Sequence, residues 1–354
     1  MSRIRRIFPG GNTANGFCSF HDNIISEDRK QLYIFKGMPG GGKSSLMKDM
    51  ADKMIEKGYS IEYHHCPSDP SSVDAIVIEE LKICLLDGTA PHNIDPTYPG
   101  ITDKIIDLAQ FIDKDKIVGK KEDIVKAKKN NKIAYKRAFN YFKAAKVIYE
   151  GIVDDNKRMI DIKGLNNETI NLIESVFSKE PMAINSNGFK ERHLFSTAYT
   201  PEGFVDYTDT ILRWIPDIYY INGEIGTGRS MLLDRLLVES RIRNYEVEIY
   251  HNALIPEKIE SLYIKELDTI ITSNKHGEVR GKAIIDLNKY LDSNNINKED
   301  MNMFSLLVEK GVIDLNGAKE NHFILEKSYR PSVDFSCVNR IREEIYNEIL
   351  TYIK

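Results

Sequence analysis

The segment from Gly37 to Ser44 has the residue types and spacing of a loop that binds phosphate. Its sequence, GMPGGGKS, matches the pattern G-x-x-x-x-G-K-[ST] at every fixed position. Glycines let consecutive backbone N–H groups curl around an anion, an approach that side chains would block. Lys43 is expected to reach the β- and γ-phosphates, and the hydroxyl of Ser44 to ligate magnesium. The sequence therefore predicts a site for Mg²⁺ and ATP formed by Gly37, Pro39, Gly40, Gly41, Gly42, Lys43, Ser44 and Ser45.

A magnesium site of this kind also needs a carboxylate at the end of a neighbouring strand. Asp87 follows the apolar run Ile83–Leu86 and precedes a glycine, which is typical of a Walker B strand end, so we expect it to hold the metal. Its rival is Glu80, which follows another apolar run, Ala75–Ile78, and could polarise a water molecule. We favour Asp87, because the glycine after it suits a strand end that opens onto a ligand.

Two histidines stand close to these predicted strand ends. His92 follows Asp87 within the segment DGTAPH and is expected at the same edge of the sheet, where it could sense the γ-phosphate or contact a substrate. His65 ends its own predicted strand and could act in the same way. The alternative for both is a structural role, since lone histidines more often satisfy local hydrogen bonds.

The chain repeats itself at the scale of a domain. Leu32–Leu81 aligns without a gap on Ile218–Leu267, and 13 of the 50 pairs are identical. Because the period is near 180 residues, the repeat indicates duplication of a domain and not a solenoid. We expect a first domain over residues 1–185, with a basic helical segment over 103–180, and a second domain over 186–354 that ends in helices.

The second copy keeps the glycine-rich loop but changes its chemistry. Arg229 replaces the expected lysine, and guanidinium is bulkier and forked where the site suits a compact charge. Ser273 stands at the position of Asp87, and Glu224 places a negative charge in the loop. The second loop is therefore expected to bind nucleotide weakly or not at all, and not to hydrolyse it, although it keeps candidate binding residues Gly223, Gly226, Gly228, Arg229 and Ser230.

Strands and helices alternate around the two loops. Gln31–Lys36 is a short apolar run that predicts a strand, and the residues after the loop have apolar positions at helical spacing. A strand is expected again over Tyr59–His65, and helix from about Asp103 to Ile152. The predicted fold class is α/β, with two tandem P-loop NTPase-type domains, each a mostly parallel sheet flanked by helices and carrying a helical appendage. Ligands collect at the carboxyl ends of the strands in such sheets.

The amino-acid composition limits the class of protein and the compartment that we expect. The 354 residues are 42% hydrophobic and 29% charged, as in a globular protein, and no apolar run approaches the roughly 18 residues that a membrane span needs. No apolar stretch follows the first residues as a signal peptide would require. The four cysteines are widely spaced, which fits a reducing compartment. The expectation is a cytoplasmic protein that does not contact a membrane.

A basic stretch runs from Lys114 to Lys146. It has twelve Lys and Arg residues against three acids, although the whole chain has a net charge of −4. The stretch could hold nucleic acid, or it could lend Lys136 or Arg137 to the site as a lid. We favour a solvated helical hairpin with inward-facing aromatic residues, namely Tyr135, Phe139, Tyr141 and Phe142.

Both halves of the chain resemble one known family. The sequence is similar to the tandem P-loop ATP-binding proteins of low-GC bacteria, which are often labelled ATPase or nucleotide kinase. The resemblance rests on FPGGNT at 8–13 with Gly16-Phe17, the loop at 37–44, DGTAPH at 87–92 with Asp95-Pro96, TPEGFVDYTD at 200–209 and the loop at 223–230. It implies a two-domain P-loop fold and ATP binding, without a firm substrate. Arg229 departs from the lysine of the family, which places a second catalytic site in doubt.

Two classes of function follow from these expectations. In one, the first domain hydrolyses ATP, or transfers its γ-phosphoryl group to a nucleotide or small molecule, while the second domain is regulatory or structural. In the other, the chain is a nucleotide-controlled binding module with incidental hydrolysis, and its basic helices contact a protein partner or a second copy.

Overall fold

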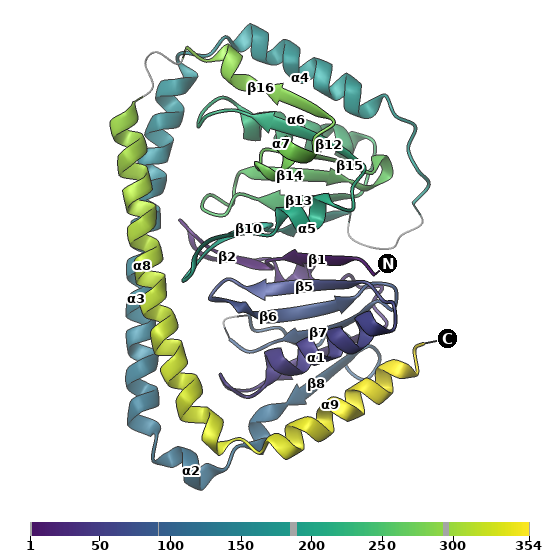
Figure 1. Ribbon diagram of the computed structural model, residues 1–354, viewed down its shortest axis with the longest axis vertical. Helices are drawn as coiled ribbons and strands as arrows, with labels where there is room; N and C mark the ends of the chain where they lie inside the picture. Colours follow the sequence, from purple (N-terminus) through teal and green to yellow (C-terminus); the bar gives the residue numbers. More distant parts are fainter. Residues whose placement is uncertain (1, 91, 185–189, 293–296, 354) are drawn as a thin grey trace.

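The computed structural model describes residues 2–90, 92–184, 190–292 and 297–353. Two six-stranded sheets flanked by helices form its body (Figure 1). The first sheet has the order β1 (Ile4–Ile7), β5 (Ile61–Cys66), β6 (Asp69–Ile78), β7 (Ile83–Asp87), β4 (Gln31–Lys36) and β8 (Asp103–Asp107). In this sheet β6 is antiparallel to both of its neighbours, and the remaining pairs are parallel. The predicted α/β class with mostly parallel sheets is confirmed.

The second sheet repeats the first strand by strand. Its order is β9 (Glu191–Leu194), β13 (Val247–His251), β14 (Ile259–Ile264), β15 (Thr269–Thr272), β12 (Asp217–Asn222) and β16 (Ala283–Asp286). Each copy also has a small antiparallel hairpin, formed by β2 (Gly10–Thr13) with β3 (Gly16–Ser19) and by β10 (Thr197–Thr200) with β11 (Gly203–Asp206). The same strand order in both sheets agrees with the duplication read from the sequence.

Short helices and the helix after each glycine-rich loop complete the two copies. The helix after the first loop is α1 (Lys43–Glu56), and its counterpart is α6 (Arg229–Ile242). The remaining short elements are η1 (His21–Asn23), η2 (Leu108–Phe111), α2 (Lys114–Val118), α5 (Thr208–Leu212), η3 (Lys265–Leu267), α7 (His276–Arg280), η4 (Leu287–Tyr290) and η6 (Arg330–Ser332).

The prediction of helix from about residue 103 is wrong at its start. Residues Asp103–Asp107 form the edge strand β8, which pairs in parallel with β4. The sequence of this strand, DKIID, does not alternate apolar with polar residues. The strand lies at the edge of the sheet and pairs only with β4. Asp103 is buried against Arg29, with Nη2 and Oδ2 2.7 Å apart, and this tertiary ion pair anchors a segment whose local pattern does not predict a strand.

Two long helices run antiparallel beside both sheets. They are α3 (Lys121–Lys157) and α8 (Lys298–Tyr329), which lie side by side along one flank of the molecule in Figure 1. Their close approach needs a glycine, because a Cβ at Gly311 would lie 2.3 Å from the Phe142 ring. The basic stretch is therefore not a hairpin by itself: most of it belongs to α3, and the partner of α3 comes from the second copy.

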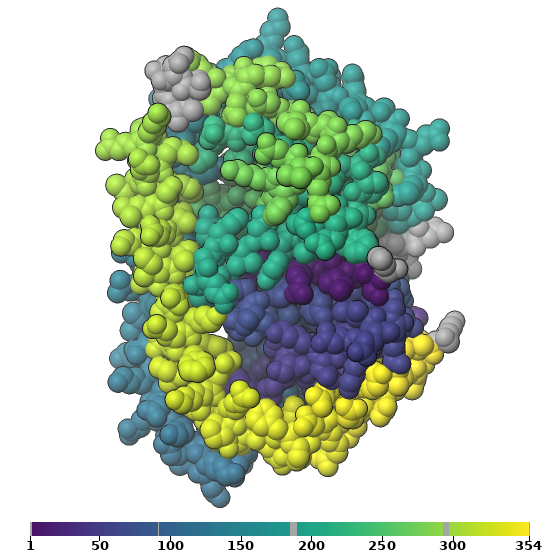
Figure 2. Space-filling view, in the orientation of Figure 1, coloured from purple at the N-terminus to yellow at the C-terminus, as the bar shows by residue number. Residues whose placement is uncertain are grey.

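The last helix of each copy covers the sheet of the other copy. Apolar residues of α4 (Ile162–Phe177) pack in the core of the second sheet, and those of α9 (Phe335–Leu350) pack in the core of the first. Helix α4 can reach the second sheet because α3, which precedes it and has 37 residues, is about 55 Å long. Figure 2 shows α9, in yellow, lying across the first copy. The division into 1–185 and 186–354 does not describe this exchange, and its boundary lies outside the described residues.

A buried ionic network joins the two sheets where β1 and β9 approach each other. The Arg5 guanidinium contacts Glu62 of its own copy and Glu248 of the other, with Nη1 2.9 Å from Glu248 Oε2. Arg192 makes the corresponding contacts to the same two carboxylates. Burial opposes ionisation, but the two guanidinium groups hold the pKa of Glu62 well below its usual value. Removal of one member would leave one buried charge without compensation, so the network ties the copies into one unit.

Among the described residues, no helix is both long enough and apolar enough to cross a membrane.

Candidate functional site

The predicted phosphate-binding loop connects β4 to α1. Gly40 and Gly42 adopt φ values of 72° and 90°, in the left-handed region that favours glycine. Helix α1 begins at Lys43, and its N-cap residue Gly42 has no side chain to satisfy the first N–H groups. The loop thus directs the positive end of a 14-residue helix toward the carboxyl edge of the sheet.

Lys43 and Asp87 meet at this edge. Strand β7 lies beside β4 in parallel, with Asp87 opposite Phe35, so the end of β7 adjoins the start of the loop. Lys43 Nζ lies 3.4 Å from Asp87 Oδ2 and donates a hydrogen bond to the Met38 carbonyl at 3.0 Å. The other oxygen of Asp87 accepts from the Thr89 N–H at 2.9 Å. The structure therefore brings together the two residues that the sequence singles out for phosphate and metal.

The two serines of the motif have different surroundings. Ser44 Oγ accepts a hydrogen bond from the N–H of Val73, on β6, at 3.1 Å. Magnesium ligation by Ser44 would therefore use its second lone pair. Ser45 is exposed on the first turn of α1.

The structure places Glu80 at the opposite edge of the sheet. Because β6 is antiparallel to its neighbours, its last residues lie where the parallel strands begin. The Glu80 carboxylate accepts two hydrogen bonds from the N–H of Ser60, at 2.9 and 3.1 Å, just before β5. In the second copy Glu266 accepts the same pair from Glu246. This repeated arrangement indicates a structural role, and Glu80 is not brought to the loop.

His92 lies in a buried cluster that the sequence did not predict. Its imidazole stacks on His21, with ring centroids 3.9 Å apart, and its Nε2 is 3.6 Å from Asp74 Oδ1. Burial lowers the pKa of His92, but the nearby Asp74 carboxylate outweighs this, and the net pKa is raised. Pro91, which precedes His92 in the predicted motif, lies outside the described residues. No sequence signal links the three cluster residues, because they come from three separate segments.

His65 is held by a hydrogen bond within its own copy. Its Nδ1 lies 2.9 Å from the Pro70 carbonyl oxygen, and burial lowers its pKa to about 4. The equivalent His251 pairs with Pro256 in the same way. His65 also lines a cavity of about 350 Å³ that includes Arg6 but no residue of the glycine-rich loop.

Each glycine-rich loop is covered by a helix of the other copy. At Gly40 a Cβ would lie 3.0 Å from the Glu326 carbonyl oxygen, near the end of α8. At Gly226 a Cβ would lie 2.9 Å from Asn156, near the end of α3, and Asn156 Nδ2 donates to the Ile225 carbonyl at 2.6 Å. These glycines are required by close approach as well as by backbone conformation. The sequence did not indicate this contact, because it crosses between the copies.

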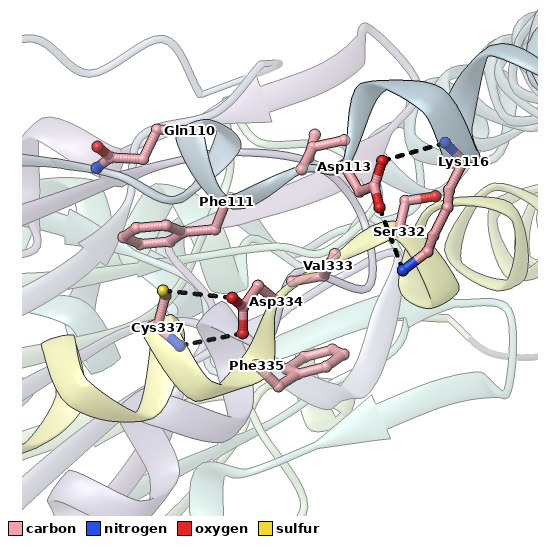
Figure 3. A pocket seen from close by; sticks show the side chains of 10 residues that line it. Gln110, Phe111, Asp113, Lys116, Ser332, Val333, Asp334, Phe335 and Cys337 are labelled. Atoms are coloured by element: carbon pink, nitrogen blue, oxygen red, sulfur yellow. Dashed lines mark hydrogen bonds and ion pairs between the residues drawn. The ribbon is translucent and has the colours of Figure 1, made fainter.

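A pocket of about 590 Å³ lies beside the end of α8, the helix that covers the first loop (Figure 3). Its walls come from the segment around η2 and α2 and from the segment that joins α8 to α9. Asp113 and Asp334 face the pocket, and each accepts hydrogen bonds from the helix it precedes. Phe335, another lining residue, would be 3.5 Å from a Cβ at Gly42, so one side chain separates the pocket from the loop.

The second loop has the same shape and different chemistry. Gly226 and Gly228 have φ values of 85° and 98°, and α6 begins at Arg229. The register of β12 with β15 matches that of β4 with β7, which places Ser273 at the position of Asp87. Ser273 Oγ donates to the Glu260 carbonyl at 3.1 Å, and Glu224 is exposed. The sequence alignment, which places Ser273 where the first copy has the carboxylate of Asp87, is therefore correct at this position.

Two carboxylates at the loop edges were not predicted. Asp107 is the last residue of β8, opposite Lys36, and Asp286 is the last residue of β16 in the second sheet, opposite Asn222. Each accepts a hydrogen bond from the short helix that follows it, from Ala109 in the first copy. Asp107 was not predicted as a site residue because the sequence predicts helix, and not a strand end, at this position.

The basic stretch is mostly a solvated surface. Lys146 is partly buried and pairs with Glu257 at 2.8 Å, while the other Lys and Arg residues of the stretch are exposed. Three of the four aromatic residues pack inward as favoured: Phe142 is fully buried, Phe139 packs against the same cluster, and Tyr135 donates to Ser68 Oγ at 2.6 Å. Arg137 pairs with Asp314, which lies 12 residues, or about 18 Å along α8, from the contact with the first loop. A lid role for Lys136 or Arg137 has no support in this arrangement.

We expect no retention of nucleic acid by this surface. Most of the exposed lysines lie on α3, and that helix has no exposed aromatic residue on which bases could stack. Filter binding of DNA and RNA at about 50 mM salt should show no retention above that of a Lys128→Glu, Lys132→Glu variant. Retention by the wild type that falls with salt, with a log–log slope of several units, would contradict this expectation.

Comparison of the chain with protein-family models, curated proteins and solved structures finds no match. No activity can therefore be transferred to this chain from a relative. The fold and the two glycine-rich loops define an α/β protein with a duplicated sheet.

Proposed function

We propose that the chain is a P-loop NTPase that binds Mg-ATP at the loop Gly37–Ser44 and hydrolyses it. The observation that carries this proposal is the meeting of Lys43 and Asp87, 3.4 Å apart, at the carboxyl edge of the first sheet. Sequence motif, left-handed glycines and the start of α1 all support an anion site at the same place. A structural loop would not need a buried cation beside a strand-end carboxylate.

Each residue then has a distinct role. Lys43 would exchange its bond to the Met38 carbonyl for contacts to the β- and γ-phosphates, and Asp87 would be released toward the metal. The hydroxyl of Ser44 and the carboxylate of Asp87 are the hard oxygen ligands that magnesium prefers. When bound there, the metal would neutralise charge on the phosphates.

The second copy is proposed to act as a structural or regulatory partner. It supplies α9 to the first core and the end of α8 to the first loop. Arg229 lies at the second loop, where Glu260 and Lys258 are among its charged neighbours. Because Ser273 replaces the metal carboxylate, one hydrolytic site per chain is expected.

The test counts bound nucleotide and measures phosphate release. We expect one Mg-ATP per chain and phosphate release without an added acceptor, which separates hydrolysis from transfer to a second substrate. Absence of binding at about 1 mM ATP, near the upper end of ordinary KM values, would overturn the proposal.

Arg229→Ala tests the role of the second copy. The substitution is expected to leave at least half of the turnover, because Arg229 lies in the other loop. Loss of hydrolysis while nucleotide still fills the first loop would instead show that Arg229 acts on the first site, and the second copy would be part of the catalyst.

A further inference from the structure

His21, Asp74 and His92 form a compact group near the glycine-rich loop, and the charges of Asp87 and Lys43 both act on His92. His21 lies in η1, Asp74 on β6, and His92 after β7, and one ligand atom from each lies within 4.8 Å of the others. Their side chains are 1%, 6% and 9% exposed. Two imidazoles and a carboxylate are thus gathered where water has little access.

Several polar atoms of this group are unsatisfied. His21 Nε2 and Asp74 Oδ2 are buried, and among the described residues neither has a hydrogen-bond partner. They lie 3.6 Å apart, and His92 Nε2 is likewise 3.6 Å from Asp74 Oδ1. These separations are long for a hydrogen bond, whereas tetrahedral ligands at about 2.1 Å from one ion lie about 3.4 Å from each other. The spacing suits ligands that share a cation.

The surroundings orient the group for this role. Ser19 Oγ lies 2.8 Å from His21 Nδ1, which leaves Nε2 directed at Asp74. Such outer hydrogen bonds commonly set the ring orientation of metal-binding histidines. The Phe17 ring lies 5.9 Å from His92 and 6.3 Å from His21 and forms an apolar wall.

The second copy shows what the same fold does without the histidines. Thr208 and Glu260 stand at the positions of His21 and Asp74. Glu260 is satisfied by a hydrogen bond from Thr197 Oγ1 at 2.9 Å, and its burial raises its pKa to about 7. The buried acid of the second copy thus has a hydroxyl partner where Asp74 faces two imidazoles.

We propose that His21, Asp74 and His92 bind a divalent transition-metal ion of the Zn²⁺ type. Nitrogen and carboxylate ligands in this number suit Zn²⁺ and leave a fourth position open. The two imidazole rings, which now stack, splay apart to place both Nε2 lone pairs on the ion. None of its three ligands is a ligand of the magnesium ion in the proposed hydrolysis, so the proposal does not depend on that activity.

The test measures zinc content after equilibration with Zn²⁺ and removal of free metal by gel filtration. The wild-type chain is expected to retain one equivalent, and Asp74→Asn and His92→Gln less than a tenth of it. His193→Gln, at a partly exposed histidine outside the group, is the matched control and should retain the full amount. Cobalt substitution should give a visible absorption band in the wild type that both ligand variants lack.

A milder variant and a loop variant separate the possible outcomes. Ser19→Ala should fold normally and weaken zinc affinity about 10- to 100-fold, as loss of an outer hydrogen bond does. Lys43→Ala should retain zinc, so failure of ATP binding and failure of zinc binding are distinguishable. A wild type that retains no zinc, or Ser19→Ala and Asp74→Asn variants that bind it as tightly as the wild type, would overturn the proposal.

Discussion

Replacing Lys43 with alanine is expected to abolish Mg-ATP binding and, with it, turnover. The substitution removes a largely buried ammonium group beside Asp87, the group expected to face the β- and γ-phosphates. At about 100 times the dissociation constant, binding stabilises a protein by about 2.7 kcal/mol, which raises the melting temperature by several degrees. Differential scanning fluorimetry with Mg-ATP should show this rise in the wild type and most of it lost in Lys43→Ala.

Lys48 provides the matched control for this experiment. It lies one turn further along α1, where its Nζ donates to the Ser71 carbonyl outside the loop. Lys48→Ala should therefore keep the full nucleotide-dependent shift. Melting of both variants without nucleotide shows that they are folded, and a Lys43→Ala protein that still shifts as the wild type does would place the binding site elsewhere.

Replacing Asp87 with asparagine should separate binding from chemistry. Asparagine keeps the shape of the side chain and the hydrogen bond from Thr89, but it loses the charge that supports the cation. Nucleotide affinity should persist in large part, whereas magnesium-dependent phosphate release should fall about 100-fold or more, as when one charge-stabilising group is removed from an active site. Steady-state phosphate release, measured against nucleotide binding on the same samples, gives both quantities.

Glu80→Gln is the comparison that decides between the two carboxylates. Glu80 accepts its hydrogen bonds from Ser60 at the opposite edge of the sheet, so Glu80→Gln should leave turnover near that of the wild type. The assignment of Asp87 would be wrong if Glu80→Gln crippled turnover while Asp87→Asn was mild.

Local features were predicted well from the sequence. The glycine-rich loop, strand β4 before it and helix α1 after it depend on neighbouring residues and on short-range periodicity. The duplication could also be predicted, because the copies align without a gap over the loop and the next two strands. Asp87 was placed correctly beside the loop, since an apolar run followed by a carboxylate and a glycine is itself a local pattern.

The edge strand β8 and the sheets against which α4 and α9 pack could not be predicted from local sequence patterns. Strand β8 is polar because it lies at a sheet edge, and its burial depends on the ion pair of Asp103 with Arg29, 74 residues away. Helices α4 and α9 have ordinary apolar faces that would fit either sheet. The lengths and pairing of α3 and α8 decide which sheet each one reaches, and an amphipathic pattern does not specify its partner.

The sequence by itself therefore determined the first loop, its lysine, its strand-end carboxylate and their degeneration in the second copy. Only the tertiary structure decided that each loop is covered by the other copy and that His21, Asp74 and His92 meet. The physical reason is the range of the interactions. A loop that wraps an anion is built from consecutive backbone groups, whereas a buried cluster joins segments whose separation along the chain carries no signal of their contact.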